Sequence, residues 1–125
     1  MAMTAHLLYR AWDETRCASV SPLVIAEIIR GEIGFEGLLI SDDLTMEALS
    51  GTPAERARAV IAAGCDVALH GSGELRDSEA VAAAAGEMSE AALARLERAM
   101  ARCAVEATAD CPALAAKRDA LLAYA

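Results

Sequence analysis

Side chains able to do chemistry follow three short apolar runs of the sequence. They are Asp42 with Asp43, His6, and His70 with the loop 71–73 (Gly-Ser-Gly). A carboxylate can act as a nucleophile, a general base or a metal ligand, and a histidine can transfer protons. A glycine loop before a helix can bind phosphate. Each feature also has a purely structural alternative. The aspartates could cap a helix, the histidines could form hydrogen bonds in the interior, and the glycines could permit a tight turn. The secondary structure around these residues is therefore needed to choose between the two.

Each apolar run is typical of a buried parallel strand whose carboxyl end reaches solvent. The runs are Ala2–Leu8, Gly37–Ile40 and Cys65–Leu69, and they recur at a spacing of about 30 residues, the length of a strand–helix–strand unit. We therefore expect three parallel strands joined by helical crossovers.

Helix signals lie between and after these runs. Ser21 and Pro22 are an N-cap and a first-turn proline for a helix over 23–32. Residues 52–55 (Thr-Pro-Ala-Glu) form a capping box for a second helix that ends at Gly64. Three more helices are predicted without intervening strands, near Glu74–Ala85, Ser89–Val105 and Pro112–Ala125.

This order predicts an α/β fold: the C-terminal part of a (β/α)8 barrel over residues 1–73, followed by a helical segment, 74–125, that packs on the barrel. In such barrels catalytic groups lie at the carboxyl ends of the strands, where Asp42 and Asp43 are expected. One of the two would face the barrel mouth while the other braces a loop. Three strands cannot close a barrel, so we expect a longer polypeptide or a partner chain.

Composition excludes several classes of function. The net charge of −8 argues against nucleic acid and anionic membranes as partners. No apolar run approaches the roughly 20 residues of a membrane-spanning helix. The N-terminus lacks a secretory signal, which predicts a cytoplasmic protein. The four cysteines have no metal-ligand spacing, so we expect reduced thiols, no metal and no cofactor.

The segment Gly34–Leu49 resembles the nucleophile-bearing stretch of glycoside hydrolase family 3, in particular its bacterial β-N-acetylhexosaminidases. The shared pattern is G-F-(D/N/E)-G, an apolar strand, and then (S/T)-D-(D/A)-L-x-M. Met3–His6 and Ala63–Asp66 are similar to segments that flank this stretch in the family. The resemblance covers residues 1 to about 73, and the ordered set of three segments makes it specific.

This resemblance implies a retaining glycosidase that removes terminal β-linked N-acetylglucosamine, with Asp42 as the nucleophile and Asp43 in a structural role. For a cytoplasmic bacterial member it also implies muropeptide substrates and a role in peptidoglycan recycling. The family's acid/base histidine and its Lys-His sugar-binding pair precede the first strand of this chain. The substrate-binding residues are therefore unknown here, and we expect the isolated chain to be an inactive fragment.

Two alternatives stay open. The chain could be a non-catalytic half-barrel that assembles with a separately encoded N-terminal half. It could also belong to a phosphate-binding barrel of other chemistry, a reading that depends on the loop 71–73 alone. Trp12 either stacks on a sugar ring or covers the barrel edge.

Overall fold

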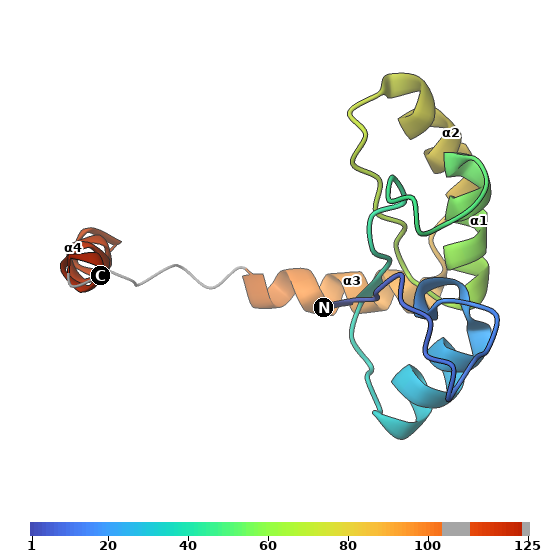
Figure 1. Ribbon diagram of the computed structural model, residues 1–125, viewed down its shortest axis with the longest axis horizontal. Coiled ribbons are helices and arrows are strands. Elements are labelled where there is room, and N and C mark those ends of the chain that lie inside the picture. The colour runs from blue at the N-terminus through green and yellow to red at the C-terminus, as the bar shows by residue number, and fades with distance from the viewer. Residues whose placement is uncertain (104–110, 124–125) are drawn as a thin grey trace.

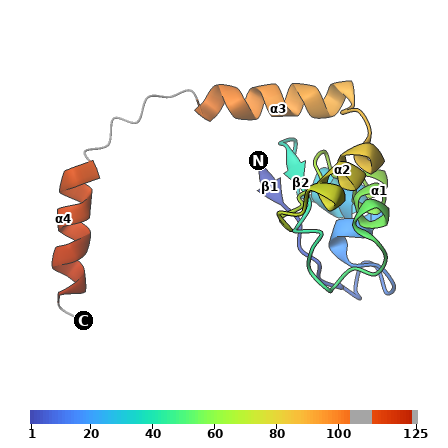
Figure 2. The same cartoon turned by 90° about the horizontal axis from the view of Figure 1, so that it is seen from above.

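The computed structural model describes residues 1–103 and 111–123, which form a helix-rich fold around a small parallel sheet (Figures 1 and 2). In both views α4 is drawn apart from the other elements. The elements in chain order are β1 (Ala2–Met3), the 3-10 helix η1 (Ala18–Val20), the π-helix η2 (Val24–Glu32), β2 (Leu39–Ile40), α1 (Pro53–Ala63), α2 (Leu75–Ala85), α3 (Glu90–Cys103) and α4 (Cys111–Leu122).

The sheet has β2 at its centre. Strands β1 and β2 run parallel, with Ala2 opposite Leu39 and Met3 opposite Ile40. On its other side Ile40 forms a parallel bridge with Val67. The predicted parallel order of three extended segments is therefore confirmed.

The predicted strand lengths are wrong. Each named strand has two residues, and the third segment contributes a single bridge, so the described residues form a two-stranded sheet and no closed barrel. Between β2 and the third segment, side chains bind backbone groups that a longer ladder would use. The amide of Leu39 donates to Asp66 Oδ2 at 2.8 Å, and the amide of Leu69 donates to Ser41 Oγ at 3.0 Å.

The helical segment that contains η2 begins as predicted. Ser21 Oγ accepts a hydrogen bond from the Val24 amide at 3.1 Å and donates to Asp13 Oδ2 at 2.7 Å. The sequence did not indicate its wide winding. At its end the Ile33 amide binds the Ile28 carbonyl, five residues back, at 2.8 Å.

The cap signals of α1 are confirmed at both ends. Thr52 Oγ1 accepts from the Glu55 amide, while Glu55 Oε2 accepts from the Thr52 amide at 2.8 Å. Gly64 closes the helix with a φ of 112°, a conformation that favours glycine. The later helices α2, α3 and α4 each start within a residue of the predicted position. The predicted ends at Val105 and Ala125 lie outside the described residues.

The core is aliphatic, as the shortage of aromatic residues predicts. It lies where β2 and the loop after it meet α1 and α2, which pack side by side (Figure 1). Burial of each large side chain contributes about 1.5–3 kcal/mol to folding. The buried members of this core are Ile25, Leu39, Leu44, Leu49, Ala57, Val60, Ala63, Cys65 and Val81.

One carboxylate joins three distant parts of this fold. The side chain of Asp66 is 5% exposed and accepts from Arg30 Nη2 at 2.9 Å and Arg95 Nη1 at 2.7 Å, besides the Leu39 amide. Arg30 lies in η2, Arg95 in α3 and Leu39 in β2. Arg30 Nη1 also donates to the carbonyls of Phe35 and Gly37, both at 2.8 Å.

Replacing this carboxylate should destabilise the protein strongly. In Asp66→Ala the carboxylate is lost as an acceptor for two partly buried guanidinium groups and the Leu39 amide, and Arg30 keeps only its two backbone carbonyls. We therefore expect the free energy of unfolding to fall by about 2–4 kcal/mol. Urea denaturation followed by circular dichroism measures this. Asp119→Ala is the control, because its ion pair with Arg118 is exposed and should contribute little. An equal loss in both variants contradicts the assigned role.

The core also predicts the reactivity of the cysteines. Burial raises the pKa of the Cys65 thiol to about 11, so little thiolate forms at neutral pH. Cys103 is exposed. We expect iodoacetamide to label Cys103 in the native protein and Cys65 only after unfolding, as peptide mass spectrometry would show. Labelling of Cys65 at the rate of Cys103 would contradict this packing.

Candidate active site

Asp42 lies two residues beyond the end of β2, and its backbone is held on both sides. Its amide donates to Thr4 Oγ1 at 3.3 Å, and its carbonyl accepts from Ser41 Oγ at 2.8 Å. The residue is half-buried, and its Oδ1 accepts from the Asp43 amide at 2.9 Å. No hydrogen bond from the described part of the chain reaches Oδ2. The carboxylate thus keeps one oxygen available for chemistry while the other fixes its orientation.

Asp43 connects two loops. Its Oδ1 accepts from the amides of Thr45 at 2.9 Å and Gly71 at 3.2 Å. These donors, the Thr45 amide first, hold the pKa of the Asp43 carboxyl below its ordinary value of 3.8. A Cβ at Gly71 would lie 2.7 Å from Asp43 Oδ2, so a larger residue there would push the Asp43 carboxylate aside. Asp43 therefore braces the loop after the third segment.

The two histidines have different surroundings. His6 is 8% exposed, and both ring nitrogens have partners: Nδ1 lies 2.9 Å from Ser19 Oγ and Nε2 3.0 Å from the Asp43 carbonyl. His6 is therefore a hydrogen-bonded histidine of the interior, which was the alternative to a role in proton transfer. His70 Nε2 lies 2.8 Å from Ser72 Oγ, and its Nδ1 is buried with no partner among the described residues.

The loop 71–73 does not favour phosphate binding. The Gly71 amide is already bound by the Asp43 carboxylate, whose negative charge would repel an anion. Gly73 has a φ of 77°, which a turn requires. The glycines therefore serve the turn and the close approach of Asp43.

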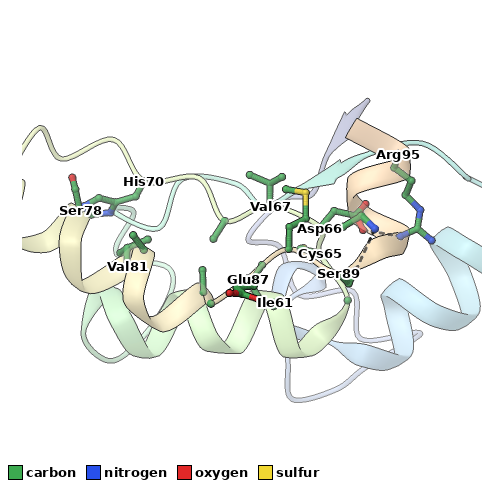
Figure 3. A pocket seen from close by; sticks show the side chains of 17 residues that line it. Ile61, Cys65, Asp66, Val67, His70, Ser78, Val81, Glu87, Ser89 and Arg95 are labelled. Atoms are coloured by element: carbon green, nitrogen blue, oxygen red, sulfur yellow. Dashed lines mark hydrogen bonds and ion pairs between the residues drawn. The ribbon is translucent and has the colours of Figure 1, made fainter. Parts of the chain in front are cut away.

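A cavity of about 640 Å³ along the described residues is separate from the aspartates. It runs between the segment Cys65–His70 and helices α2 and α3, with His70 and the Asp66–Arg95 pair toward opposite ends in Figure 3. Neither Asp42 nor Asp43 lines it. The candidate site is therefore defined by the hydrogen bonds around Asp42 and not by this cavity.

Sequence reasoning missed two members of the site, Thr4 and Ser19. Thr4 belongs to the quoted segment Met3–His6, but nothing in the pattern assigned its hydroxyl a partner. Ser19 lies in a stretch that carried no signal. In the structure Thr4 Oγ1 donates to Ser19 Oγ at 2.8 Å, and both side chains are buried.

Two other kinds of feature are absent from the described ranges. No group of three or more histidine, cysteine or acidic side chains there could hold a metal ion. None of the helices described is long and apolar enough to cross a membrane.

Comparison with known proteins identifies the family. The sequence pattern described as the Glycosyl hydrolase family 3 N terminal domain matches residues 1–105. The chain belongs to glycosyl hydrolase family 3. The resemblance drawn from the residues around Asp42 is thereby confirmed.

Curated family members match a shorter stretch. A Beta-hexosaminidase of Alkalilimnicola ehrlichii is 48% identical over 69 residues, which are 54% of this chain and 20% of that protein. A Beta-hexosaminidase of Tolumonas auensis is 45% identical over the same length. The chain thus spans about a fifth of the length of these relatives.

Solved structures of the family share the fold. A glycoside hydrolase family 3 beta-N-acetylglucosaminidase from Paenibacillus sp. superposes with a TM-score of 0.71 at 30% identity, covering 86% of this chain and 23% of that one. The beta-N-acetylglucosaminidase from Thermotoga maritima gives a TM-score of 0.60 at 26% identity, covering 79% and 24%. The helix-rich arrangement therefore corresponds to about a quarter of such an enzyme.

The hydrogen bonds that the Asp43 carboxylate accepts predict that its contribution to the stability of the protein depends on pH. A carboxyl whose pKa is lowered on folding stabilises the protein above its ordinary value of 3.8, and this stabilisation is lost as the pH falls through the lowered folded value. Asp43→Ala should therefore lower the melting temperature at pH 7, and its difference from wild type should shrink as the pH falls below 3.8.

Thermal melting between neutral and acidic pH measures this difference. Glu47→Ala is the matched control, because the Glu47 side chain is exposed and makes no hydrogen bond in the described structure. A constant gap between Asp43→Ala and wild type across the pH range would contradict the role of the ionised carboxylate.

Proposed function

We propose that this chain is the C-terminal part of a (β/α)8 barrel in a retaining β-N-acetylhexosaminidase, with Asp42 as its nucleophile. The observation that carries the proposal is the Asp42 carboxylate itself. It follows β2, is oriented by the Asp43 amide and keeps one oxygen without a partner among the described residues. The names of the relatives, Beta-hexosaminidase and beta-N-acetylglucosaminidase, support terminal N-acetylglucosamine as the sugar removed.

In the proposed reaction Asp42 Oδ2 attacks the anomeric carbon as the bond to the leaving-group oxygen breaks. That oxygen takes a proton from a general acid, and the sugar remains bound to Asp42 as an ester. Water then attacks the anomeric carbon, gives up a proton to the same group, now a base, and releases Asp42. Hydrogen bonds from the chain hold Asp42 in place during both displacements.

Hydrogen bonds already occupy His6, the histidine that binds the Asp43 carbonyl. His6 cannot serve as the general acid, because its Nε2 donates to the Asp43 carbonyl and its Nδ1 binds Ser19. We therefore propose that the isolated chain is inactive and that the rest of the barrel supplies the acid and the sugar-binding residues. Muropeptides as substrates, peptidoglycan recycling as the role and the cytoplasm as the location are parts of the same proposal.

Exchange of the nucleophile tests this function in the full-length gene product that contains the chain. Asp42→Asn should lower the hydrolysis of an aryl N-acetyl-β-glucosaminide on the order of 10³-fold or more, because an amide cannot form the glycosyl ester. Glu47→Gln, an exposed carboxylate on the same segment, should keep wild-type turnover. Mass spectrometry with a slow fluorinated substrate should find the sugar on the Asp42 peptide. Wild-type turnover in Asp42→Asn would overturn the proposal.

A second candidate is a half-barrel that assembles with a separate N-terminal half. One observation favours it: neither backbone group of Ala68 makes a hydrogen bond in the described structure, and the 640 Å³ cavity lies along the same segment. An unpaired strand edge beside a cavity can accept another strand. Co-expression with the N-terminal part of a relative should then yield a stable, active complex. An in-frame N-terminal half encoded upstream of Met1 would exclude this candidate.

A further inference from the structure

We propose that Thr4, Ser19 and His6 form a positioning network that holds the Asp42 carboxylate in its reactive orientation. The inference rests on the proposed function, because it assigns a purpose to the orientation of the nucleophile. None of the three side chains contacts the Asp42 carboxylate. They act on it through the backbone of residues 42 and 43.

The network starts and ends on the backbone of the aspartate pair. The Asp42 amide donates to Thr4 Oγ1 at 3.3 Å, Thr4 Oγ1 donates to Ser19 Oγ at 2.8 Å, and Ser19 Oγ lies 2.9 Å from His6 Nδ1. His6 Nε2 then lies 3.0 Å from the Asp43 carbonyl. Thr4 and Ser19 are 15 positions apart in the sequence, and His6 and Asp43 are 37 apart. Their hydrogen bonds nevertheless form a closed loop that includes the backbone of the nucleophile.

The direction of every hydrogen bond follows from its two ends. A carbonyl oxygen only accepts, so His6 Nε2 carries the proton and Nδ1 is the acceptor. Ser19 Oγ must then donate to Nδ1, which leaves its lone pairs for the Thr4 hydroxyl. Thr4 in turn accepts from the Asp42 amide, which can only donate. Each hydroxyl donates once and accepts once, so all members are satisfied with a single tautomer of His6.

Burial makes the arrangement hard to change. Thr4, Ser19 and His6 are 6%, 0% and 8% exposed, so water cannot readily replace a lost partner. A rotation of the peptide before Asp42 or of the peptide after Asp43 would leave buried donors and acceptors unpaired, which is costly in an interior. These two peptides are therefore confined to one orientation, and the peptide between Asp42 and Asp43 is held by the Ser41 hydroxyl.

The network acts on the Asp42 carboxylate through residue Asp43. The Asp43 amide binds Asp42 Oδ1 at 2.9 Å, and the carbonyl of the same residue is the group that His6 holds. On the opposite side Ser41 Oγ donates to the Asp42 carbonyl and accepts from the Leu69 amide. The carboxylate is thus fixed between the first and third extended segments, with Oδ2 directed by the bond that Oδ1 makes.

Precise placement matters for this chemistry, because an attacking atom displaced by about 1 Å can cost on the order of 10²-fold in rate. The test uses two substitutions of Thr4 in the full-length gene product. Thr4→Val keeps the shape but removes the hydroxyl, whereas Thr4→Ser keeps the hydroxyl and removes the methyl group. We expect Thr4→Val to lower kcat by about 10- to 100-fold with KM nearly unchanged, and Thr4→Ser to stay close to wild type.

Two readouts separate positioning from folding. Titration with a slow fluorinated substrate counts the competent enzyme, so kcat is given per folded site. Val81→Ala, a core change in α2 far from the network in sequence, reports what destabilisation alone does to kcat. If Val81→Ala lowers kcat per site as much as Thr4→Val, or if Thr4→Ser and Thr4→Val lose activity equally, the hydroxyl has no positioning role.

The rate of hydrogen exchange at the Asp42 amide tests the network independently of catalysis. Exchange should accelerate in Thr4→Val and stay slow in Thr4→Ser, because only the first loses the acceptor. Unchanged exchange in Thr4→Val would overturn the network, and faster exchange with wild-type kcat would overturn its positioning role. Failure of the hydrolase proposal appears elsewhere, as an inactive wild type or a fully active Asp42→Asn.

Discussion

The buried Asp66 carboxylate and its two arginines constrain the whole arrangement. A charged carboxylate in an interior is costly unless its oxygens are paired, and the chain meets this condition with Arg30, Arg95 and the Leu39 amide. These partners come from η2, α3 and β2, so the ion pairs are possible only when all three elements are in place. The site depends on this, because Leu39 lies in the strand that leads to Asp42.

Side-chain hydrogen bonds add to a short backbone ladder in holding the extended segments together. Asp66 binds the amide of Leu39, Ser41 binds the amide of Leu69, and Asp43 binds the amide of Gly71. Each contact removes a backbone group from regular pairing and fixes one loop relative to its neighbour. The contacts of Ser41 and Asp43 with the third segment therefore connect the architecture to the chemistry we propose for Asp42.

Local signals in the sequence were sufficient for the helices and for the family. The capping box of Thr52 and Glu55, the Ser21 cap and the Gly64 terminus involve residues that are near neighbours in the chain, so their geometry follows from the sequence. Membership of glycosyl hydrolase family 3 likewise followed from the segment around Asp42. Strand length could not be predicted, because it depends on which distant side chains bind the backbone.

By itself the sequence determined the order of elements, the helix boundaries within a few residues and the position of the aspartate pair after the central strand. Only the tertiary structure decided which histidine lies beside the aspartates and which hydroxyls bind them. It also decided that the amide of Gly71 belongs to Asp43. The physical reason is separation along the chain: His6 and the Asp43 carbonyl are 37 residues apart, and no local preference encodes a contact that only packing creates.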